Sequence, residues 1–232
     1  MERKVIGNIG ILDIRQATEK SLEAIQSIGN VGNIFFSKET AHLIPRLAAG
    51  NIGNTLEVSG EFNVVSGKME ISHASVACQA VPKSLVIMGK LTIKGDVTPE
   101  DLEGAVGDLV VMGKVICPQG LQSRLQNKIK HIAGKVVSYP DGAILQDGDL
   151  ELDATALAAL PDQAVLAVMG NLKIARGTPN DLLGRKLNRL FVAQAILCFE
   201  RNASILQHVL DPQSSRKIEV IPDDYRVLDG PC

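Results

Sequence analysis

The sequence predicts an α/β fold, a right-handed solenoid with a parallel sheet on one wall and short helices on the other. Three observations lead to this class. One stretch of sequence recurs 81 residues further along the chain, a glycine lies at a fixed place in an alternating strand pattern, and short helical segments separate the strands. We therefore expect that the chain arose by tandem duplication of an 81-residue unit.

The duplication is clearest around Gly89 and Gly170. Residues 85–93 read LVIMGKLTI, and residues 166–174 read LAVMGNLKI. The same offset relates three further glycine pairs, which are Gly32 and Gly113, Gly53 and Gly134, and Gly67 and Gly148. Because several unrelated positions share one offset, the match indicates a duplicated unit.

The strand pattern places apolar residues two and four positions before and after an anchor glycine, which is the period of a half-buried strand. The anchors are Gly10, Gly32, Gly53, Gly67, Gly89, Gly113, Gly134, Gly148 and Gly170, with Gln194 in the tenth place. We expect one strand to run through each anchor. Glycine inside a strand indicates a bend or the close approach of a neighbouring backbone.

Helix start signals lie between the strands. Thr98-Pro99 and Thr178-Pro179 each combine a capping hydroxyl with proline at the first helical position, and Ser72 and Asp153 look like matching N-caps. Further helices are expected over residues 17–28, 39–49, 121–129 and 204–210. An eleventh strand is expected at Lys217–Ile221.

The repeat predicts one solenoid domain over residues 1–232. Its parts are an N-terminal coil at 5–31, a first duplicated unit at 32–112, a second at 113–193, the start of a third at 194–221, and a tail at 222–232.

This pattern of periodic strands and short helices resembles the leucine-rich repeats, in which each repeat holds a strand and a helix or turn. The resemblance covers most of the chain, although the strand here passes through a glycine. A weaker resemblance is to the bactofilins, bacterial cytoskeletal proteins with repeated strands of glycine and apolar residues. These resemblances imply a repeat protein with a binding or assembly role.

Composition disfavours several classes of function. The formal net charge is −2 and aromatic residues make up 3% of the chain, so neither a basic nucleic-acid surface nor a base-stacking platform is expected. No apolar run approaches the length of a membrane span, and the N-terminus does not resemble an export signal. We expect a cytoplasmic protein.

No catalytic or metal-binding motif is present. The histidines show no HxH or HExxH spacing, and the cysteines show no CxxC pair. We expect no cofactor. Cys117 and Cys198 fall on apolar strand positions and are expected to be buried thiols, whereas Cys232 would be the more reactive one.

Two polar features depart from the repeat and are candidate sites. Asp149, Glu151 and Asp153 alternate with leucines, which puts three carboxylates on one face of a strand. They indicate either a carbohydrate- or metal-binding face, and possible enzymatic chemistry, or a solvated face that ends in a helix cap.

The second feature is a lysine that directly follows the anchor glycine in four adjacent repeats: Lys68, Lys90, Lys114 and Lys135. Stacked strands would bring these lysines to a spacing of about 5 Å. Such a ladder would favour an anionic partner, or it is an ordinary polar stripe.

The sequence therefore favours a non-enzymatic scaffold that binds another protein. An alternative is a self-assembling structural protein, because the N-terminal coil keeps apolar residues where a solenoid normally has a polar cap. These residues are Val5, Ile6, Ile9, Ile11, Leu12 and Ile14. A homo-oligomer formed through this coil is therefore expected.

Overall fold

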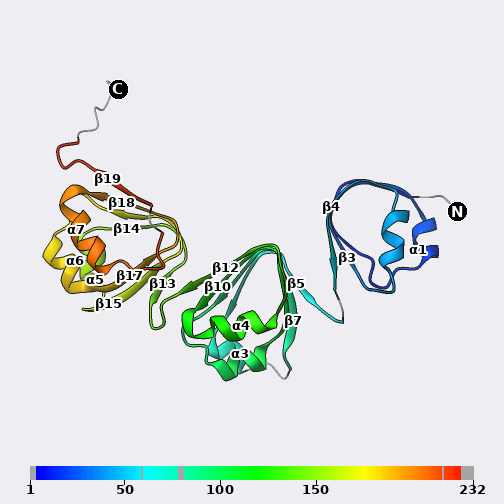
Figure 1. The fold of residues 1–232 in the computed structure, drawn as a ribbon, viewed down its shortest axis with the longest axis horizontal. Helices are drawn as coiled ribbons and strands as arrows, with labels where there is room; N and C mark the ends of the chain where they lie inside the picture. The colour runs from blue at the N-terminus through cyan, green and yellow to red at the C-terminus, as the bar shows by residue number, and fades with distance from the viewer. Residues whose placement is uncertain (1–3, 59, 78–80, 216, 226–232) are drawn as a thin grey trace. The chain divides into compact units, whose positions relative to one another are not determined.

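The computed structural model describes residues 4–58, 60–77, 81–215 and 217–225. It has parallel strands and short helices, which confirms the predicted α/β class. The chain divides into two compact units, Met1–Phe62 and Asn63–Cys232 (Figure 1). This boundary coincides with none of the limits of the sequence repeats. Cys78, Cys232 and the end of the predicted tail lie outside the described residues.

Unit 1 is a small parallel sheet with one α-helix and one 3-10 helix. Its elements are β1 (Lys4–Ile6), β2 (Ile9–Asp13), α1 (Glu19–Glu23), β3 (Ile25–Phe36), η1 (Ala41–Arg46) and β4 (Ala49–Glu57). The long strand β3 lies in the middle, with β1 and β2 on one side and β4 on the other. The helix predicted over residues 17–28 is shorter, because its second half begins β3.

The first half of unit 2 contains two four-stranded sheets. One holds β5 (Asn63–Val65), β7 (Lys83–Ile87), β9 (Val106–Val111) and β11 (Ile129–Ile132); the other holds β6 (Lys68–Ile71), β8 (Lys90–Ile93), β10 (Lys114–Pro118) and β12 (Lys135–Tyr139). The helices are α2 (His73–Val76), α3 (Pro99–Ala105), η2 (Gln119–Leu121) and α4 (Gln122–Lys128). In Figure 1, α3 and α4 close the open side between the two sheets.

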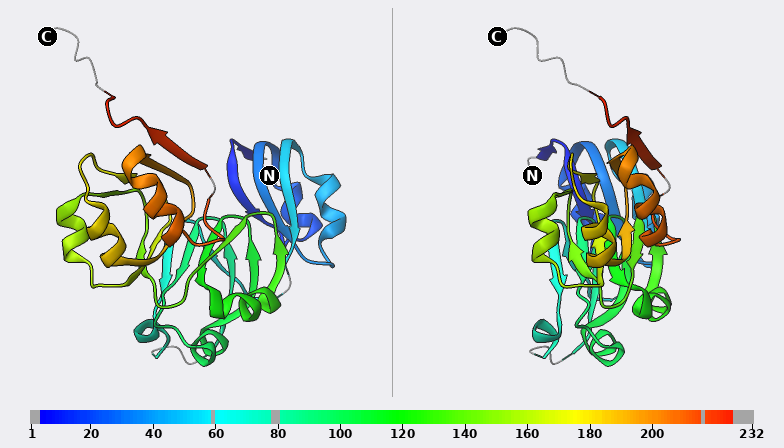
Figure 2. Two further views of the ribbon diagram at one scale, coloured as in Figure 1. Left: turned by 60° about the vertical axis from the view of Figure 1, so that its left-hand side comes forward. Right: turned by 90° about the vertical axis from the view of Figure 1, so that its left-hand side faces the viewer.

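The second half repeats this plan. One sheet holds β13 (Ile144–Gln146), β15 (Ala164–Val168) and β17 (Leu187–Val192); the other holds β14 (Leu150–Leu152), β16 (Leu172–Ile174), β18 (Ala195–Phe199) and β19 (Lys217–Ile221). Helices α5 (Ala154–Ala159), α6 (Asn180–Lys186) and α7 (Glu200–Val209) lie side by side along one wall (Figure 2). The predicted eleventh strand is confirmed as β19.

The prediction of one strand through each anchor glycine is wrong in unit 2. At Gly89 the chain bends, so that β7 before it and β8 after it belong to different sheets. The same bend separates β9 from β10 at Gly113 and β15 from β16 at Gly170. Each half of unit 2 therefore has two sheet walls and one helical wall, and glycines such as Gly89, Gly113 and Gly170 mark the corner between the sheets.

Close backbone contact explains why glycine occupies these corners. A Cβ atom on Gly113 would lie 2.0 Å from the carbonyl oxygen of Gly89, and one on Gly134 would lie 2.1 Å from that of Gly113. Backbone hydrogen bonds hold the corners together, since the Gly113 and Lys114 amides donate to Ile87 and Gly89 over 2.7 and 2.8 Å. At Gly113 and Gly134, stacking at this distance leaves no room for a side chain.

Most of the predicted helix caps are present. Thr98 forms a capping box with Asp101, and Ser72 and Asp153 cap α2 and α5 as expected. Thr178 differs, because its hydroxyl is buried and donates to the Ala175 carbonyl over 2.8 Å. Helix α6 instead begins after Pro179.

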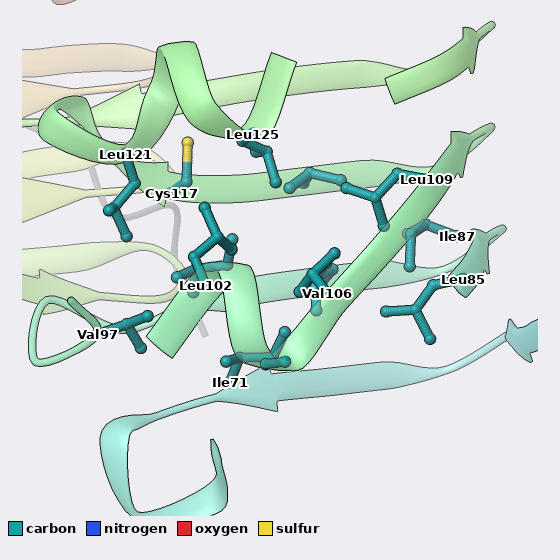
Figure 3. Close-up of a cluster of buried hydrophobic side chains, with 14 of the residues drawn as sticks. Ile71, Leu85, Ile87, Val97, Leu102, Val106, Leu109, Cys117, Leu121 and Leu125 are labelled. Atoms are coloured by element: carbon teal, nitrogen blue, oxygen red, sulfur yellow. The ribbon is translucent and has the colours of Figure 1, made fainter. Parts of the chain in front are cut away.

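Each half of unit 2 has its own apolar core. Figure 3 shows the first, where Leu85 and Ile87 of one sheet and Cys117 of the other meet Leu102 and Leu125 of the helices. A second, separate cluster contains Cys198. Both cysteines are buried free thiols, as predicted, and burial raises the pKa of Cys117 to about 12.

The corner contact predicts a strong dependence on residue 113. Gly113→Ala should destabilise the fold by about 1–3 kcal/mol, because the new methyl group overlaps the Gly89 carbonyl. The matched control is Gly104→Ala in α3, where nothing lies near the new Cβ and the helix should gain up to about 1 kcal/mol. Urea denaturation measures both. Equal stabilities for the two variants would contradict the corner model.

The cores also predict thiol reactivity. Cys117 and Cys198 should resist alkylation by iodoacetamide in the folded protein, because both are buried and their raised pKa values disfavour the reactive thiolate. Both should react after denaturation. Peptide mapping by mass spectrometry reads each cysteine separately, and rapid labelling of either one in the native state would show that its core is open.

Candidate functional site

The four predicted lysines do stack on neighbouring strands. Lys68 pairs in register with Lys90, Lys90 with Lys114, and Lys114 with Lys135. They follow the corner glycines, so the ladder runs along the corner between the two sheets of the first half of unit 2. The sequence therefore predicted this juxtaposition correctly.

The surroundings of this lysine ladder differ from an open cationic surface. Lys90 forms an ion pair with Asp147, which comes from the second half of unit 2. Partial burial lowers the pKa of Lys114, and the nearby charges of Lys90 and Lys135 lower it further. Part of the ladder is thus neutralised within the unit, and the exposed lysines are Lys68 and Lys135 at its two ends.

The sheet beside the ladder is covered. Ile116 and Val137 point away from the core of the first half, yet they are buried against Ala167, Met169 and Phe191 of the second half. The outer faces of the β6/β8/β10/β12 sheet and the β13/β15/β17 sheet therefore pack on each other. This packing joins the two halves of unit 2 and places the lysine ladder at the margin of a buried interface.

The three candidate carboxylates have separate partners. Asp149 accepts hydrogen bonds from the Asn171 backbone and side-chain amides over 2.7 and 3.2 Å. Glu151 forms an ion pair with Lys173 at 2.9 Å, and Asp153 caps α5 through the Ala156 amide at 2.7 Å. Within the described residues no group of three or more acidic, histidine or cysteine side chains could hold a metal ion.

A groove lies on the face that carries Asp149 and Glu151. Its volume is about 460 Å³, and it spans the outer face of the β14/β16/β18/β19 sheet. Its lining residues are Asp149, Leu150, Glu151, Asn171, Leu172, Lys173, Ala195, Ile196, Leu197 and Glu219. Ala195 and Leu197 contribute apolar surface in the middle of the sheet, whereas exposed Lys173 and Glu219 lie on either side of Leu197 in register.

This groove occupies the position that is covered in the first half of unit 2. Leu197 lies 81 residues after Ile116, so the two are equivalent in the duplication. Ile116 is fully buried by the adjoining sheet, but Leu197 remains partly exposed. Both strands contain a continuous apolar run in the sequence, within KVICP and AILCF. Such a run is the signal for an apolar outer face, because unbroken apolar strands indicate that both faces are covered.

Unit 1 contains polar ladders that the sequence reasoning missed. Asn51 donates from Nδ2 to the Asn30 Oδ1 over 2.7 Å, and Asn30 donates likewise to Asn8 over 3.0 Å. Asn54 donates to Asn33 over 3.1 Å in a second, shorter ladder. The signal was present as a motif that occurs three times, Gly-Asn-X-Gly, at residues 7–10, 29–32 and 50–53.

Comparison with known proteins gives no relative from which a site could be transferred. No protein-family model matches the chain, and no curated protein or solved structure is significantly similar to it. In the described part of the chain, no helix has the length and apolar character that crossing a membrane requires.

The lysine ladder predicts opposite effects for two neighbouring substitutions. Lys114→Met should raise the melting temperature, because it removes a partly buried charge that Lys90 and Lys135 repel. Lys90→Met should lower it, because Asp147 loses its cationic partner.

The pH dependence provides the control for this pair. Since the pKa of Lys114 is lowered on folding, the unfolded chain holds the lysine proton more tightly than the folded chain does. The destabilising effect of the charged Lys114 therefore fades as pH rises through the pKa of the folded state. The advantage of Lys114→Met should therefore shrink at alkaline pH and in high salt. Thermal melts that give both variants the same sign would contradict this description of the ladder.

Proposed function

We propose that the protein is a non-enzymatic scaffold that binds a protein partner through the outer face of the β14/β16/β18/β19 sheet. One observation supports this most. The equivalent face in the first half of unit 2 is covered by a second sheet through Ile116, Val137 and Phe191, whereas this face has an open groove. The open face of the β14/β16/β18/β19 sheet is therefore equivalent to a face that packs on another sheet, and it has the geometry to bind one.

The chemistry of the groove suits a protein surface. An apolar centre at Ala195 and Leu197 with charged residues around it follows the usual plan of an interface core and rim. Complete burial of a leucine side chain contributes about 1.5–3 kcal/mol, so Leu197 could act as an anchor. Lys173 and Glu219 on either side of Leu197 would restrict the partner's orientation through charge.

The scaffold has the architecture of a solenoid in this proposal. Repeats with parallel strands in register, corner glycines and side-by-side helices support it. Each half of unit 2 would then be a short solenoid with two sheet walls and one helical wall, in contrast to the single sheet wall of a leucine-rich repeat.

A carbohydrate- or metal-binding role, or an enzyme, at Asp149, Glu151 and Asp153 has less support. Asp149 accepts a hydrogen bond at the corner, Glu151 forms an ion pair, and Asp153 caps a helix. A site for a hard cation needs several oxygen ligands that converge on one point, and these carboxylates are committed to different partners.

Photo-crosslinking at position 197 tests the proposal. A benzophenone amino acid replaces Leu197 in the full chain, and the control carries it at exposed Ser123 on α4. In cells that make the protein, irradiation should give a discrete protein adduct from position 197 that mass spectrometry identifies, and none from position 123. The same adducts from both positions, or none from position 197, would count against the groove as a binding site.

A second variant checks the chemistry of that adduct. Leu197→Lys places a charge in the apolar centre of the groove and should abolish co-purification of the crosslinked partner. Ser123→Lys should leave it unchanged, and circular dichroism confirms that both variants are folded.

A further inference from the structure

Unit 1 has two open sheet edges with exposed backbone. On one side β1 and β2 pair only with β3, and on the other side β4 pairs only with β3, among the residues that the structure describes. Residues 50–55 of β4 are all exposed, and so are Gly7, Asn8 and Gly10 on the opposite side. Within the described part of unit 1, the sheet therefore ends at strands whose outward backbone donors and acceptors have no partner strand.

The middle segments of the two edges lack the usual protection against further strand pairing, since the charged residues Lys4, Asp13 and Glu57 lie only at the strand ends. Edge strands normally carry charged residues or proline that prevent association. Residues 50–55 read GNIGNT and residues 7–12 read GNIGIL, without a charge or a proline in either segment. The edge strand β19, by contrast, carries Lys217 and Glu219.

The apolar core of unit 1 also continues to both edges. Ile9, Val31 and Ile52 form one column across β2, β3 and β4. Val31 in the middle is 2% exposed, but Ile52 at the end is 37% exposed. The column therefore ends in apolar surface on the β4 side, where another coil could continue it.

The asparagine ladder has a direction that makes its two ends complementary. Each asparagine donates from Nδ2 to the Oδ1 of the asparagine one coil earlier, from Asn51 to Asn30 and from Asn30 to Asn8. Among the described residues, Asn8 therefore has an unused Nδ2 donor and Asn51 an unused Oδ1 acceptor. A donor at one end and an acceptor at the other match head to tail.

We infer that unit 1 associates head to tail with unit 1 of a second copy of this chain. The β4 edge of one copy pairs with the β1 and β2 edge of the next, in the register that β3 and β4 already use. Asn51 then accepts from Asn8 of the second copy, and Ile52 packs on its Ile9. Each step repeats the Gly-Asn-X-Gly stacking found inside the unit.

This contact is heterologous, so it leaves one free edge at each end of a dimer and permits longer open assemblies. It is independent of the groove in unit 2, which plays no part in it. Stacked parallel strands with asparagine ladders pair every backbone group between neighbouring chains, which gives such contacts their stability.

In unit 2 an aspartate, Asp149, occupies the position at the start of a ladder that Asn8 occupies in unit 1. Asp149 starts a similar corner ladder, and its Oδ1 accepts from the backbone and side-chain amides of Asn171, as Asn8 Oδ1 does from Asn30. A carboxylate supports the following coil but offers no donor to a preceding one. Aspartate thus starts a ladder that cannot be extended, whereas Asn8 starts one that can.

The first experiment applies this contrast to unit 1. Light scattering on a sizing column, over a wide concentration range, should show that the mass of the full wild-type chain grows with concentration. Asn8→Asp should abolish that growth, because it keeps the acceptor for Asn30 but removes the donor and places a carboxylate against Asn51 Oδ1 of the preceding copy. Asn8→Gln, which keeps a donor, should retain part of the growth.

The second experiment blocks the opposite edge and tests the head-to-tail geometry. Ile52→Lys puts a charge on the exposed end of the apolar column and should also give a monomer. An equimolar mixture of Asn8→Asp and Ile52→Lys should form a one-to-one dimer and nothing longer, since each variant retains the edge that the other lacks. A symmetric contact between identical edges would not give this result.

The outcomes are decisive in either direction. A wild-type chain that stays monomeric at all concentrations overturns the inference, as does growth that survives both Asn8→Asp and Ile52→Lys in folded protein. Circular dichroism and thermal melts verify folding of each variant. Leu197→Lys serves as the independent control and should leave the growth unchanged, so that association through the unit 2 groove is distinguished from association through unit 1.

Discussion

The close approach of Gly89, Gly113 and Gly134 to the carbonyl of the glycine one repeat earlier is the constraint on which the first half of unit 2 depends. At Gly89 and Gly113 the chain turns sharply and still keeps hydrogen bonds with the previous coil. Because the corner is so tight, the strands before and after it lie in different sheets, and the short helices are left to close the third side. The two apolar cores and the positions of the outward-facing residues follow from this arrangement.

The regular spacing of the glycines was visible in the sequence, but the bend of the chain at each of them was not. The reason is geometric. Residues such as Leu85, Ile87, Leu91 and Ile93 face the core both in one straight strand and in two strands that meet at a bend. Periodicity therefore cannot distinguish the two cases. The caps at Thr98 and Ser72 were predictable because capping depends on residues that are close in sequence.

At the candidate sites too, features set by the regular repeat could be predicted from the sequence, whereas features set by long-range packing could not. The stacking of Lys68, Lys90, Lys114 and Lys135 follows from a regular repeat, so the sequence was sufficient for it. The pairing of Lys90 with Asp147 and the covering of Ile116 by Phe191 depend on how the two halves of unit 2 pack, which no periodic pattern encodes. The asparagine ladder of unit 1 was readable from its threefold motif, but the direction of its hydrogen bonds is visible only in the structure.

Native-state hydrogen exchange by NMR tests the corner most directly. If the glycine contacts hold the coils together, the amides of Gly113 and Lys114 should exchange as slowly as those of the adjoining strands β9 and β10, because they donate to Ile87 and Gly89 in the previous coil. Exchange of these corner amides at the rate of an exposed turn, while β9 and β10 stay protected, would contradict the account.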